Sequence, residues 1–362
     1  CLFENRQEFE AFNAAVMPAL LRGDTVQVEH TFYQRNREPV WCLATGRFID
    51  HDDQQKGTIW ALVDLTWKKH LQDTLQANLA ERKAILDTVQ VGLQLVRQGL
   101  LDLHAPVSRY LPGGYAHRQN PFGGAKAKRF DQVPAHTLAR IPVATLLNHS
   151  AGLPNWTRGA LQPEFEPGTR WQYSGEGYAL LQAVIEAVTG QGIEPAVASY
   201  AFEPLGMQQS RLRLTDDIRP QVVGGSSCVA SNALSQGHQL DFHEPNAAAS
   251  LYTTAADYAK LLSAWLADAE LLRLTLAHTV PADPGLGLSW GLGWGIETVA
   301  GGPCLWQWGN NPGFRSFAMA SVSSGNGFVL LTNSERGLAL AAPLARATVP
   351  AAHGVFRSSM LG

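Results

Sequence analysis

The sequence predicts an α+β chain built from two segments, and three observations lead to this prediction. The chain has 362 residues, enough for two domains at about 150 residues each. Residues 1–98 hold 24 of the 59 charged residues, but only 4 of the 34 glycines and 2 of the 20 prolines. Both segments carry helix-like and strand-like patterns. A break in composition of this kind indicates two segments of different origin.

Composition excludes several classes of protein. Lys and Arg number 28 against 31 Asp and Glu, a net charge of −3, so we expect no nucleic-acid partner. No run of 18 apolar residues predicts a membrane span. No leader precedes a cleavage site, which favours a cytoplasmic location. The four scattered cysteines fit neither a disulfide scaffold nor a zinc site, and we expect no metal and no cofactor. They are Cys1, Cys42, Cys228 and Cys304.

The N-terminal segment begins with a helix and three strands. A helix-like stretch over 8–21 ends at the turn Arg22-Gly23-Asp24. Runs rich in Val, Thr and aromatic residues predict strands at 26–33, 39–49 and 57–65. Short polar connections between the runs favour an antiparallel meander.

A long helix is predicted next. Thr66 is its expected N-cap, and the helix spans 67–90. Leu71, Leu75 and Leu79 share one side of it, at a spacing that suits pairing with another helix. We therefore expect a homodimer formed through 67–90.

This order of elements, closing on VDLTWKKH (63–70), resembles the second half of a PAS sensor domain over residues 1–80. The stretch ERKAILDTVQVGLQLV (81–96) resembles the linker and first strand of a second PAS repeat. The resemblance implies a sensory or dimerising segment. It assigns no cofactor-binding residue, because the half of the domain that supplies much of the pocket has no counterpart.

Three motif blocks organise residues 99–350. LLNHSAGL is a short helix ending in a glycine turn, and PGTRWQYSGEGYALL is a turn leading into an amphipathic helix that ends at Gly190. WQWGNNPGF and VLLTNS belong to a series of strands. Further helices are predicted at 251–266 and 337–347, and strands at 292–298, 303–308, 314–321 and 327–333.

In this order the blocks resemble the serine β-lactamase and penicillin-binding superfamily, nearest its class C-like enzymes, DD-peptidases and esterases. The resemblance implies a helical subdomain packed on an antiparallel sheet, with the active site between them. The family acylates a serine of an S-x-x-K motif and then hydrolyses the acyl group. It also uses a Tyr-x-Asn element and a Lys/His-x-Gly strand motif.

The second family element corresponds to Tyr173-Ser174-Gly175. The resemblance makes Tyr173 the candidate general acid/base, and Ser174 and Gly175 candidate substrate-binding residues. Gly175 stands where asparagine is usual, so recognition of a substrate amide at this position is in doubt.

The third element corresponds to Gln307-Trp308-Gly309, followed by Asn310, whose backbone N–H is the candidate oxyanion donor. Trp308 and Gly309 are candidate substrate-binding residues. Gln307 stands where a cation or histidine is usual and carries no charge. An uncharged residue there favours a small ester or peptide-like neutral ligand over a penicillin.

The first element is absent. No serine in the chain is followed by lysine three residues later, and the expected region, 81–98, has no serine at all. The nearest substitute is Thr66, in T-x-x-K with Lys69, for which N-capping is the simpler role. We therefore expect an N-terminally truncated β-lactamase-like domain, fused near 96–101 to the PAS-like segment.

Other motifs in the sequence are expected to have structural roles. His149 and Ser150 lie in N-H-S-A-G, which fails the G-x-S-x-G pattern, so both are expected to structure a turn. His238 and His243 are expected in a polar loop. GLGLSWGLGWG (285–295) is expected to be a turn between strands.

The predicted organisation is a partial PAS-like segment at 1–66, a linker or signalling helix at 67–98, a hydrolase domain at 99–350 and a tail at 351–362. The expected function is a β-lactamase-related serine hydrolase domain with little or no acyl-transfer activity. The alternatives are a PAS-type signalling module, a non-catalytic binding protein that keeps the cleft, and an accidental junction of two truncated pieces.

Overall fold

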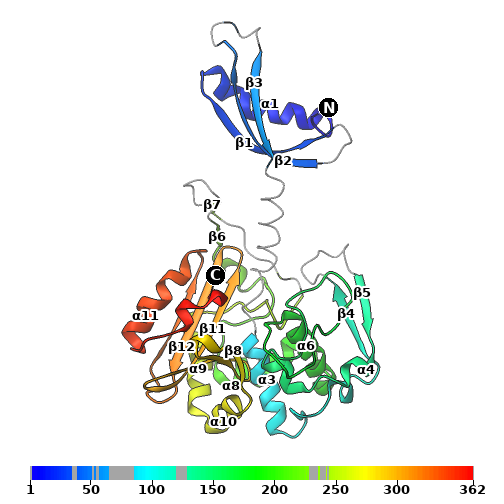
Figure 1. Ribbon diagram of the computed structural model, residues 1–362, viewed down its shortest axis with the longest axis vertical. Coiled ribbons are helices and arrows are strands. Elements are labelled where there is room, and N and C mark those ends of the chain that lie inside the picture. The colour runs from blue at the N-terminus through cyan, green and yellow to red at the C-terminus, as the bar shows by residue number, and fades with distance from the viewer. Residues whose placement is uncertain are drawn as a thin grey trace. The chain divides into compact units, whose positions relative to one another are not determined.

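The chain forms two compact units, residues 1–77 and 78–362, each with its own sheet and its own hydrophobic core (Figure 1). The structure is a computed structural model. It describes residues 2–34, 39–50, 53, 57–64, 85–119, 129–227, 235–236, 242 and 244–361.

Unit 1 is one helix packed on a three-stranded antiparallel sheet of order β1-β2-β3. Helix α1 (Arg6–Leu21) begins where Asn5 Oδ1 accepts a hydrogen bond from Glu8 N at 2.9 Å. The buried residues of α1 are four apart and pack against the sheet: Phe12, Val16 and Leu20 meet Phe32, Cys42 and Ala44. The strands are β1 (Val26–Tyr33), β2 (Pro39–Phe48) and β3 (Thr58–Asp64). The predicted helix and three strands are confirmed.

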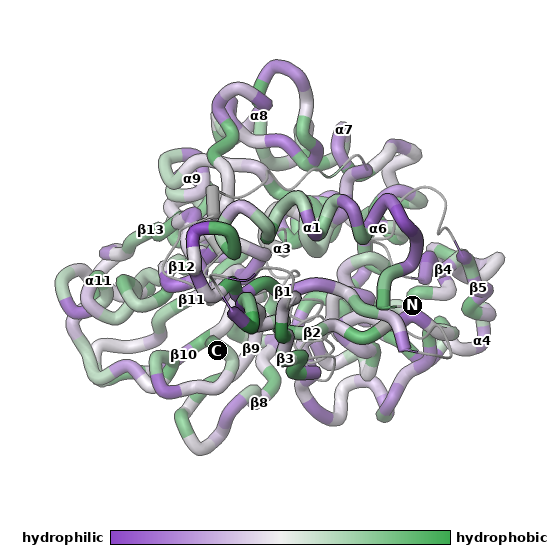
Figure 2. The backbone as a smooth tube through the Cα atoms, turned by 90° about the horizontal axis from the view of Figure 1, so that it is seen from above, coloured by the Kyte–Doolittle hydropathy of each residue, from purple (hydrophilic) through white to green (hydrophobic). Residues whose placement is uncertain are grey.

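Strand β3 leaves apolar side chains in solvent. Ile59, Leu62 and Val63 are 58%, 41% and 54% exposed, and Figure 2 shows the hydrophobic run along this strand. Among the described strands β3 pairs only with β2. Unit 1 therefore presents an apolar strand with one open edge, an arrangement that isolated sheets rarely tolerate.

Unit 2 contains a six-stranded antiparallel sheet of order β13-β12-β11-β10-β9-β8. The strands are β8 (Val280–Asp283), β9 (Leu288–Trp290), β10 (Gly295–Val299), β11 (Gly302–Asn311), β12 (Phe314–Ser321) and β13 (Gly327–Thr332). The last four confirm the strands that the sequence predicted. The interpretation of 285–295 as a turn is wrong, because β9 lies inside it.

Helices and two small hairpins complete unit 2, and Figure 1 shows α6 with the β4–β5 hairpin on one side of it and the sheet with α11 on the other. None of the helices in the described ranges is long and apolar enough to cross a membrane. The helices are α3 (Ile85–Arg97), α4 (Ala135–Leu138), α5 (Val143–Leu147), α6 (Gly175–Thr189), α7 (Ile193–Val197), α8 (Glu203–Leu205), α9 (Ala255–Ala267), α10 (Ala269–Ala277) and α11 (Ala341–Thr348). The hairpins pair β4 (Tyr115–Gln119) with β5 (Arg129–Val133), and β6 (Ser226–Ser227) with β7 (Ser235–Gln236).

Helix α3 lies in the core of unit 2. Four of its apolar side chains are fully buried: Val89, Val91, Leu93 and Leu95. The prediction of a linker and a PAS strand over 81–96 is wrong for the part that the structure describes. A helix buried on most sides loses its polar stripe, and the alternation of these four residues then imitates a strand. Residues 65–84, with Thr66 and most of the helix predicted over 67–90, lie outside the described residues.

The close fit of β10 against β11 gives a first testable prediction. An alanine Cβ at Gly295 would lie 2.4 Å from Trp306 Cε2, on its register partner. We expect Gly295→Ala to lower the free energy of unfolding by about 1–3 kcal/mol, the usual cost of overpacking, measured by urea denaturation. Gly301→Ala, whose Cβ would meet nothing within 4 Å, should stay within about 0.5 kcal/mol of wild type. Equal stability of the two variants would contradict this packing.

Candidate functional site

Tyr173 lies in the loop that leads into α6, with only 6% of its surface exposed. The helix begins at this point because Ser174 caps it. Ser174 Oγ accepts a hydrogen bond from Gly177 N and donates one to Pro154 O, both at 2.8 Å. The cap therefore fixes the backbone next to Tyr173 and uses the Ser174 hydroxyl as a structural group.

Gly175 is enclosed by a tryptophan. Its N–H donates to Asn155 Oδ1 at 3.0 Å, and a Cβ at this position would lie 2.2 Å from Trp156 Cζ2. The indole of Trp156 therefore occupies the space that a larger side chain at 175 would need. This contact explains the glycine that the sequence shows in place of asparagine.

His149 packs directly on Tyr173, with the ring centroids 4.3 Å apart. Its backbone has a φ of 57°, the only positive φ at a non-glycine residue in the described chain. Such a conformation costs of the order of 1–3 kcal/mol and persists only where the surroundings hold it. Here Gln172 N donates to the His149 carbonyl at 2.8 Å, and Ser174 N donates to Nδ1 at 3.1 Å. Because Nδ1 accepts, the neutral ring carries its proton on Nε2.

Sequence reasoning assigned His149 and Ser150 to a turn, and His149 does shape the backbone there. Its contact with Tyr173 was not predicted. The one signal for that contact was the position of His149 inside the LLNHSAGL block. Ser150 Oγ donates to Asn148 Oδ1 at 2.6 Å, and its side chain is therefore committed to the turn.

Among the strands that the structure describes, the second half of β11 has a neighbour on one side only. Strand β10 pairs with it as far as Trp306, whereas β12 pairs with it as far as Asn311. Trp308 N–H donates to Gln307 Oε1 at 3.0 Å and therefore points away from β12. Because N–H groups alternate between the two sides of an antiparallel strand, the Asn310 N–H points to the same open side. An oxyanion donor at the strand edge requires this orientation.

The side chain of Gln307 completes the strand edge where β10 turns away. Its Nε2 donates to Gly293 O, and its Oε1 accepts from Trp308 N, each at 3.0 Å. The residue is 4% exposed. The Nε2 and Oε1 atoms of Gln307 therefore both make hydrogen bonds inside the sheet, and this side chain carries no charge.

Aromatic rings fill the space between Tyr173 and the strands. The ring centroid of Trp308 lies 5.3 Å from that of Tyr173 and 5.4 Å from those of Trp290 and Trp306. All three indoles are at most 2% exposed. The structure thus brings together Tyr173 and the Gln307-Trp308-Gly309 motif, from separate blocks of the sequence, with Trp308 as the contact between them.

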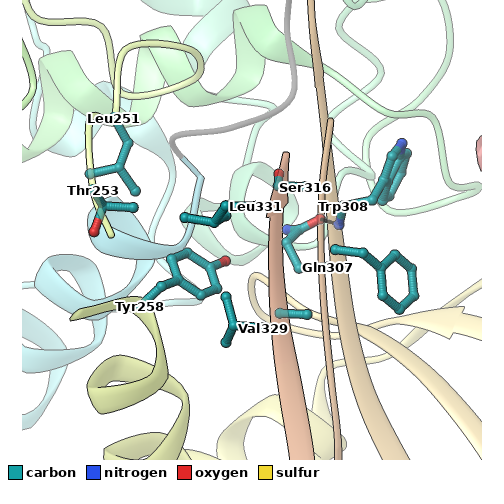
Figure 3. A pocket seen from close by; sticks show the side chains of 10 residues that line it. Leu251, Thr253, Tyr258, Gln307, Trp308, Ser316, Val329 and Leu331 are labelled. Atoms are coloured by element: carbon teal, nitrogen blue, oxygen red, sulfur yellow. Dashed lines mark hydrogen bonds between the residues drawn. The ribbon is translucent and has the colours of Figure 1, made fainter. Parts of the chain in front are cut away.

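A hollow adjoins Gln307 on the sheet and α9, and Figure 3 shows side chains that line it. Gln307, Ser316, Val329 and Leu331 come from three neighbouring strands, and Leu251, Thr253 and Tyr258 lie across from them. The free volume inside is about 10 Å³, room for about one water molecule. This hollow is too small for a substrate.

Three residues that the sequence analysis discussed are not tested by this geometry. Thr66, the nearest substitute for the nucleophile, lies outside the described residues, as do His238 and His243.

In the described part of unit 2, burial raises the pKa of Tyr178 well above its usual value, and its hydroxyl donates to Leu147 O at 2.9 Å. Tyr178 therefore stays a neutral structural phenol, which leaves Tyr173 as the tyrosine of interest.

Comparison with known proteins gives a match over most of unit 2. A family model described as beta-lactamase matches residues 88–353. Esterase EstB of Burkholderia gladioli is 27% identical over 306 residues, which cover 67% of this chain and 73% of that protein. Among solved structures, the D-amino acid amidase of Ochrobactrum anthropi SV3 superposes with a TM-score of 0.56 at 23% identity, covering 74% of this chain and 84% of that chain. The predicted β-lactamase-like arrangement of helices and sheet is confirmed.

Two further relatives match shorter stretches. A human protein named for its likeness to β-lactamases is 36% identical over 120 residues, 32% of this chain. The sensor protein TdiS of Thauera aromatica is 27% identical over 88 residues, 24% of this chain. The chain spans 23% and 14% of the lengths of these two relatives.

The contact between Gly175 and Trp156 gives a second testable prediction. We expect Gly175→Ala to destabilise unit 2 by about 1–3 kcal/mol, because the new methyl group displaces the indole. In a Trp156→Ala background the same change should cost at least about 1 kcal/mol less, since the obstacle is gone. Urea denaturation of the four proteins of this double-mutant cycle measures the difference. Strictly additive effects would show that the two residues do not meet.

Proposed function

The chain belongs to the β-lactamase family, and we propose that it is a member that binds a small ligand and carries out little or no acyl transfer. One observation carries the proposal: the sequence keeps Tyr173 and the Gln307-Trp308-Gly309 strand motif but has no S-x-x-K segment. The match of the family model begins at residue 88, inside the region, 81–98, in which the sequence analysis expected that segment.

The catalytic groups that the sequence keeps decide whether acyl transfer can occur. Acyl transfer in this family needs an oxygen nucleophile that attacks the carbonyl carbon, a base that takes its proton and a donor for the oxyanion. Tyr173 supplies an acid/base group and the Asn310 N–H supplies the donor. Neither forms the bond to carbon. Loss of a nucleophile typically removes several orders of magnitude in rate, and these two groups cannot restore it.

The ligand we propose is a neutral ester or peptide-like molecule. The Gln307 amide is uncharged and is already hydrogen-bonded within the sheet. Arg315, the register partner of Asn310, donates Nη1 to the carbonyls of Asn311 and Phe314. The Arg315 guanidinium therefore already donates to backbone carbonyls, which disfavours its use by a ligand carboxylate. A neutral carbonyl needs only the Asn310 N–H as its hydrogen-bond donor. The names of the esterase and amidase relatives agree with ligands of this class.

The domain organisation stays a proposal, with one change. The sequence analysis placed a PAS-like segment at 1–66, a linker helix at 67–98, the hydrolase domain at 99–350 and a tail at 351–362, and we keep these bounds except at the start of the hydrolase domain. The start of the hydrolase domain moves ahead of Thr88. The reason is that α3 is buried in the core of unit 2 and the family match begins with it.

The proposal is tested by the intact mass of the full chain after incubation with a fluorophosphonate and, separately, with a penicillin. We expect no adduct with either reagent, because no nucleophile is present, and a ligand-dependent rise in melting temperature with a neutral ester. A stoichiometric adduct would contradict the proposal. Peptide mapping of that adduct, with Thr66→Ala as the matched variant, would then identify the nucleophile.

A second candidate function is a PAS-type sensory module. It is supported by the helix and three strands of unit 1, by the exposed apolar strand β3, and by the match to a sensor protein. In this function unit 1 dimerises through the predicted helix 67–90, and the hydrolase-like unit binds a ligand without turnover.

Sedimentation of the full chain tests the second candidate. We expect a dimer that Leu75→Asp converts to a monomer, because a charge on the apolar side of the predicted helix opposes helix pairing. Gln76→Asp, on a neighbouring polar position of the same helix, should leave the dimer intact. A wild-type chain that sediments as a monomer at micromolar concentration would exclude pairing through this helix.

A further inference from the structure

His117 on β4 is a buried histidine held between two carboxylates. Its ring Nδ1 lies 2.6 Å from Asp131 Oδ1 on β5, and its Nε2 lies 3.1 Å from Glu176 Oε2 on α6. The side chain of His117 is fully buried. Ionised carboxylates only accept hydrogen bonds, so both ring nitrogens must donate, which requires the protonated imidazolium. Such a ring has no lone pair to offer a metal.

Each carboxylate uses its other oxygen on a nearby loop. Glu176 Oε1 accepts a hydrogen bond from Thr157 N, and Asp131 Oδ2 accepts one from Leu161 N, both at 3.0 Å. We call residues 157–161 the clipped loop. The backbone amides at both ends of this loop therefore donate to the same two carboxylates that contact the His117 ring.

The clipped loop continues from the segment that covers the start of α6. Trp156, the residue before it, packs against Gly175, and Pro154 O accepts the hydroxyl hydrogen bond of Ser174. Between its two ends the clipped loop exposes Arg158, Gly159 and Ala160 to solvent. The two carboxylate bonds thus hold the two end amides of the loop, and the Leu161 side chain is also buried in the core of unit 2.

We propose that His117 is a proton-operated latch: the imidazolium holds Asp131 and Glu176 on the clipped loop, and its deprotonation releases the Thr157 and Leu161 amides of that loop. The physical reason is that a neutral ring keeps one N–H and turns a lone pair toward the other carboxylate. One hydrogen bond is then lost, and the two buried negative charges face each other without a cation between them. This device does not depend on the ligand or activity proposed above.

The charges around the latch favour the proton. A cavity of about 200 Å³ lies beside Glu176, and Arg118, Glu186 and Glu244 are its other charged lining residues. Arg118 is paired with Glu244. Glu186 adds a further negative charge to this side. Tyr115 also lines this cavity, with its ring 6.2 Å from that of His117, and burial raises the pKa of Tyr115, so it stays neutral. Because Glu176 lines the cavity, solvent has a route to the latch.

The pKa values set the pH range. Burial by itself would lower the pKa of His117, but the hydrogen bonds and charges of Glu176 and Asp131 outweigh it and raise the pKa above 6.5. Burial likewise opposes ionisation of Asp131, but hydrogen bonds from His117, Leu161 and Gln119 outweigh it and lower its pKa below 3.8. The hydrogen bonds of the latch are therefore complete at pH values that lie above the pKa of Asp131 and below the pKa of His117. The latch is lost as pH rises through the folded-state pKa of His117, and again as pH falls through that of Asp131.

Hydrogen–deuterium exchange of the full chain tests the latch. Protection factors of the Thr157 and Leu161 amides, corrected for the intrinsic effect of pH on exchange, should fall about tenfold or more between pH 6 and pH 9. The amides of α6 should keep their protection, because the helix does not depend on the latch. Wild-type protein whose Thr157 and Leu161 protection is the same at both pH values would overturn the proposal.

Two variants locate the effect in His117. In His117→Gln the two amides should be weakly protected at both pH values, because a neutral amide cannot bridge two carboxylates. His136→Gln, at an exposed histidine of α4, should keep the wild-type profile. A wild-type pH profile in folded His117→Gln would also overturn the proposal. If that variant does not fold, the profile of the wild-type protein decides.

Discussion

The packing of the Trp308 ring against the Tyr173 ring is the interaction on which the rest of the site depends. It joins the loop before α6 to the strand motif, and Trp290 of β9 and Trp306 of β11 pack against the Trp308 ring. Aromatic pairs of this kind contribute about 0.5–1.5 kcal/mol each beyond the area that they bury. The loop before the helix and the sheet therefore meet through these aromatic rings.

This packing has a consequence for function. The contacts that orient the open edge of β11 also use the groups that a substrate would need. The Gln307 amide bonds Gly293 and Trp308, and the Ser174 hydroxyl caps α6. Tyr173 packs on Trp308, and the Asn310 N–H points to the side of β11 away from β12. These contacts agree with the proposed recognition of a neutral group.

The sequence predicted the elements that carry local signals. Helix α1 has a capping residue and a regular apolar face, and α6 runs from its Ser174 cap to Gly190, whose φ of 68° ends it. The order of the three motif blocks, LLNHSAGL, PGTRWQYSGEGYALL and WQWGNNPGF followed by VLLTNS, also gave the correct family. Helix α3 was missed because its buried residues alternate, and β9 was missed because it has three residues between glycine-rich turns.

The parts of the site that could not be predicted depend on contacts between distant residues. Nothing in the sequence near Gly175 indicates that Trp156 fills the space beside it. The place of Trp290 beside Tyr173 requires the pairing of β9 with β10, and the strained backbone of His149 requires hydrogen bonds from the distant segment 172–174. The same holds for His117, whose partners lie on another strand and on α6. Sequence patterns locate motif residues, but they do not show what packs around them.

The central claim is that the open edge of β11 can bind a ligand, whereas the chain has no nucleophile to attack it. The most direct measurement is boron-11 NMR of phenylboronic acid added to the full chain near pH 7. A reactive serine or threonine hydroxyl adds to boron and converts it from trigonal to tetrahedral. We predict that the boron signal of the protein-bound acid stays trigonal. A stoichiometric tetrahedral signal that is absent from the unfolded protein would contradict the account.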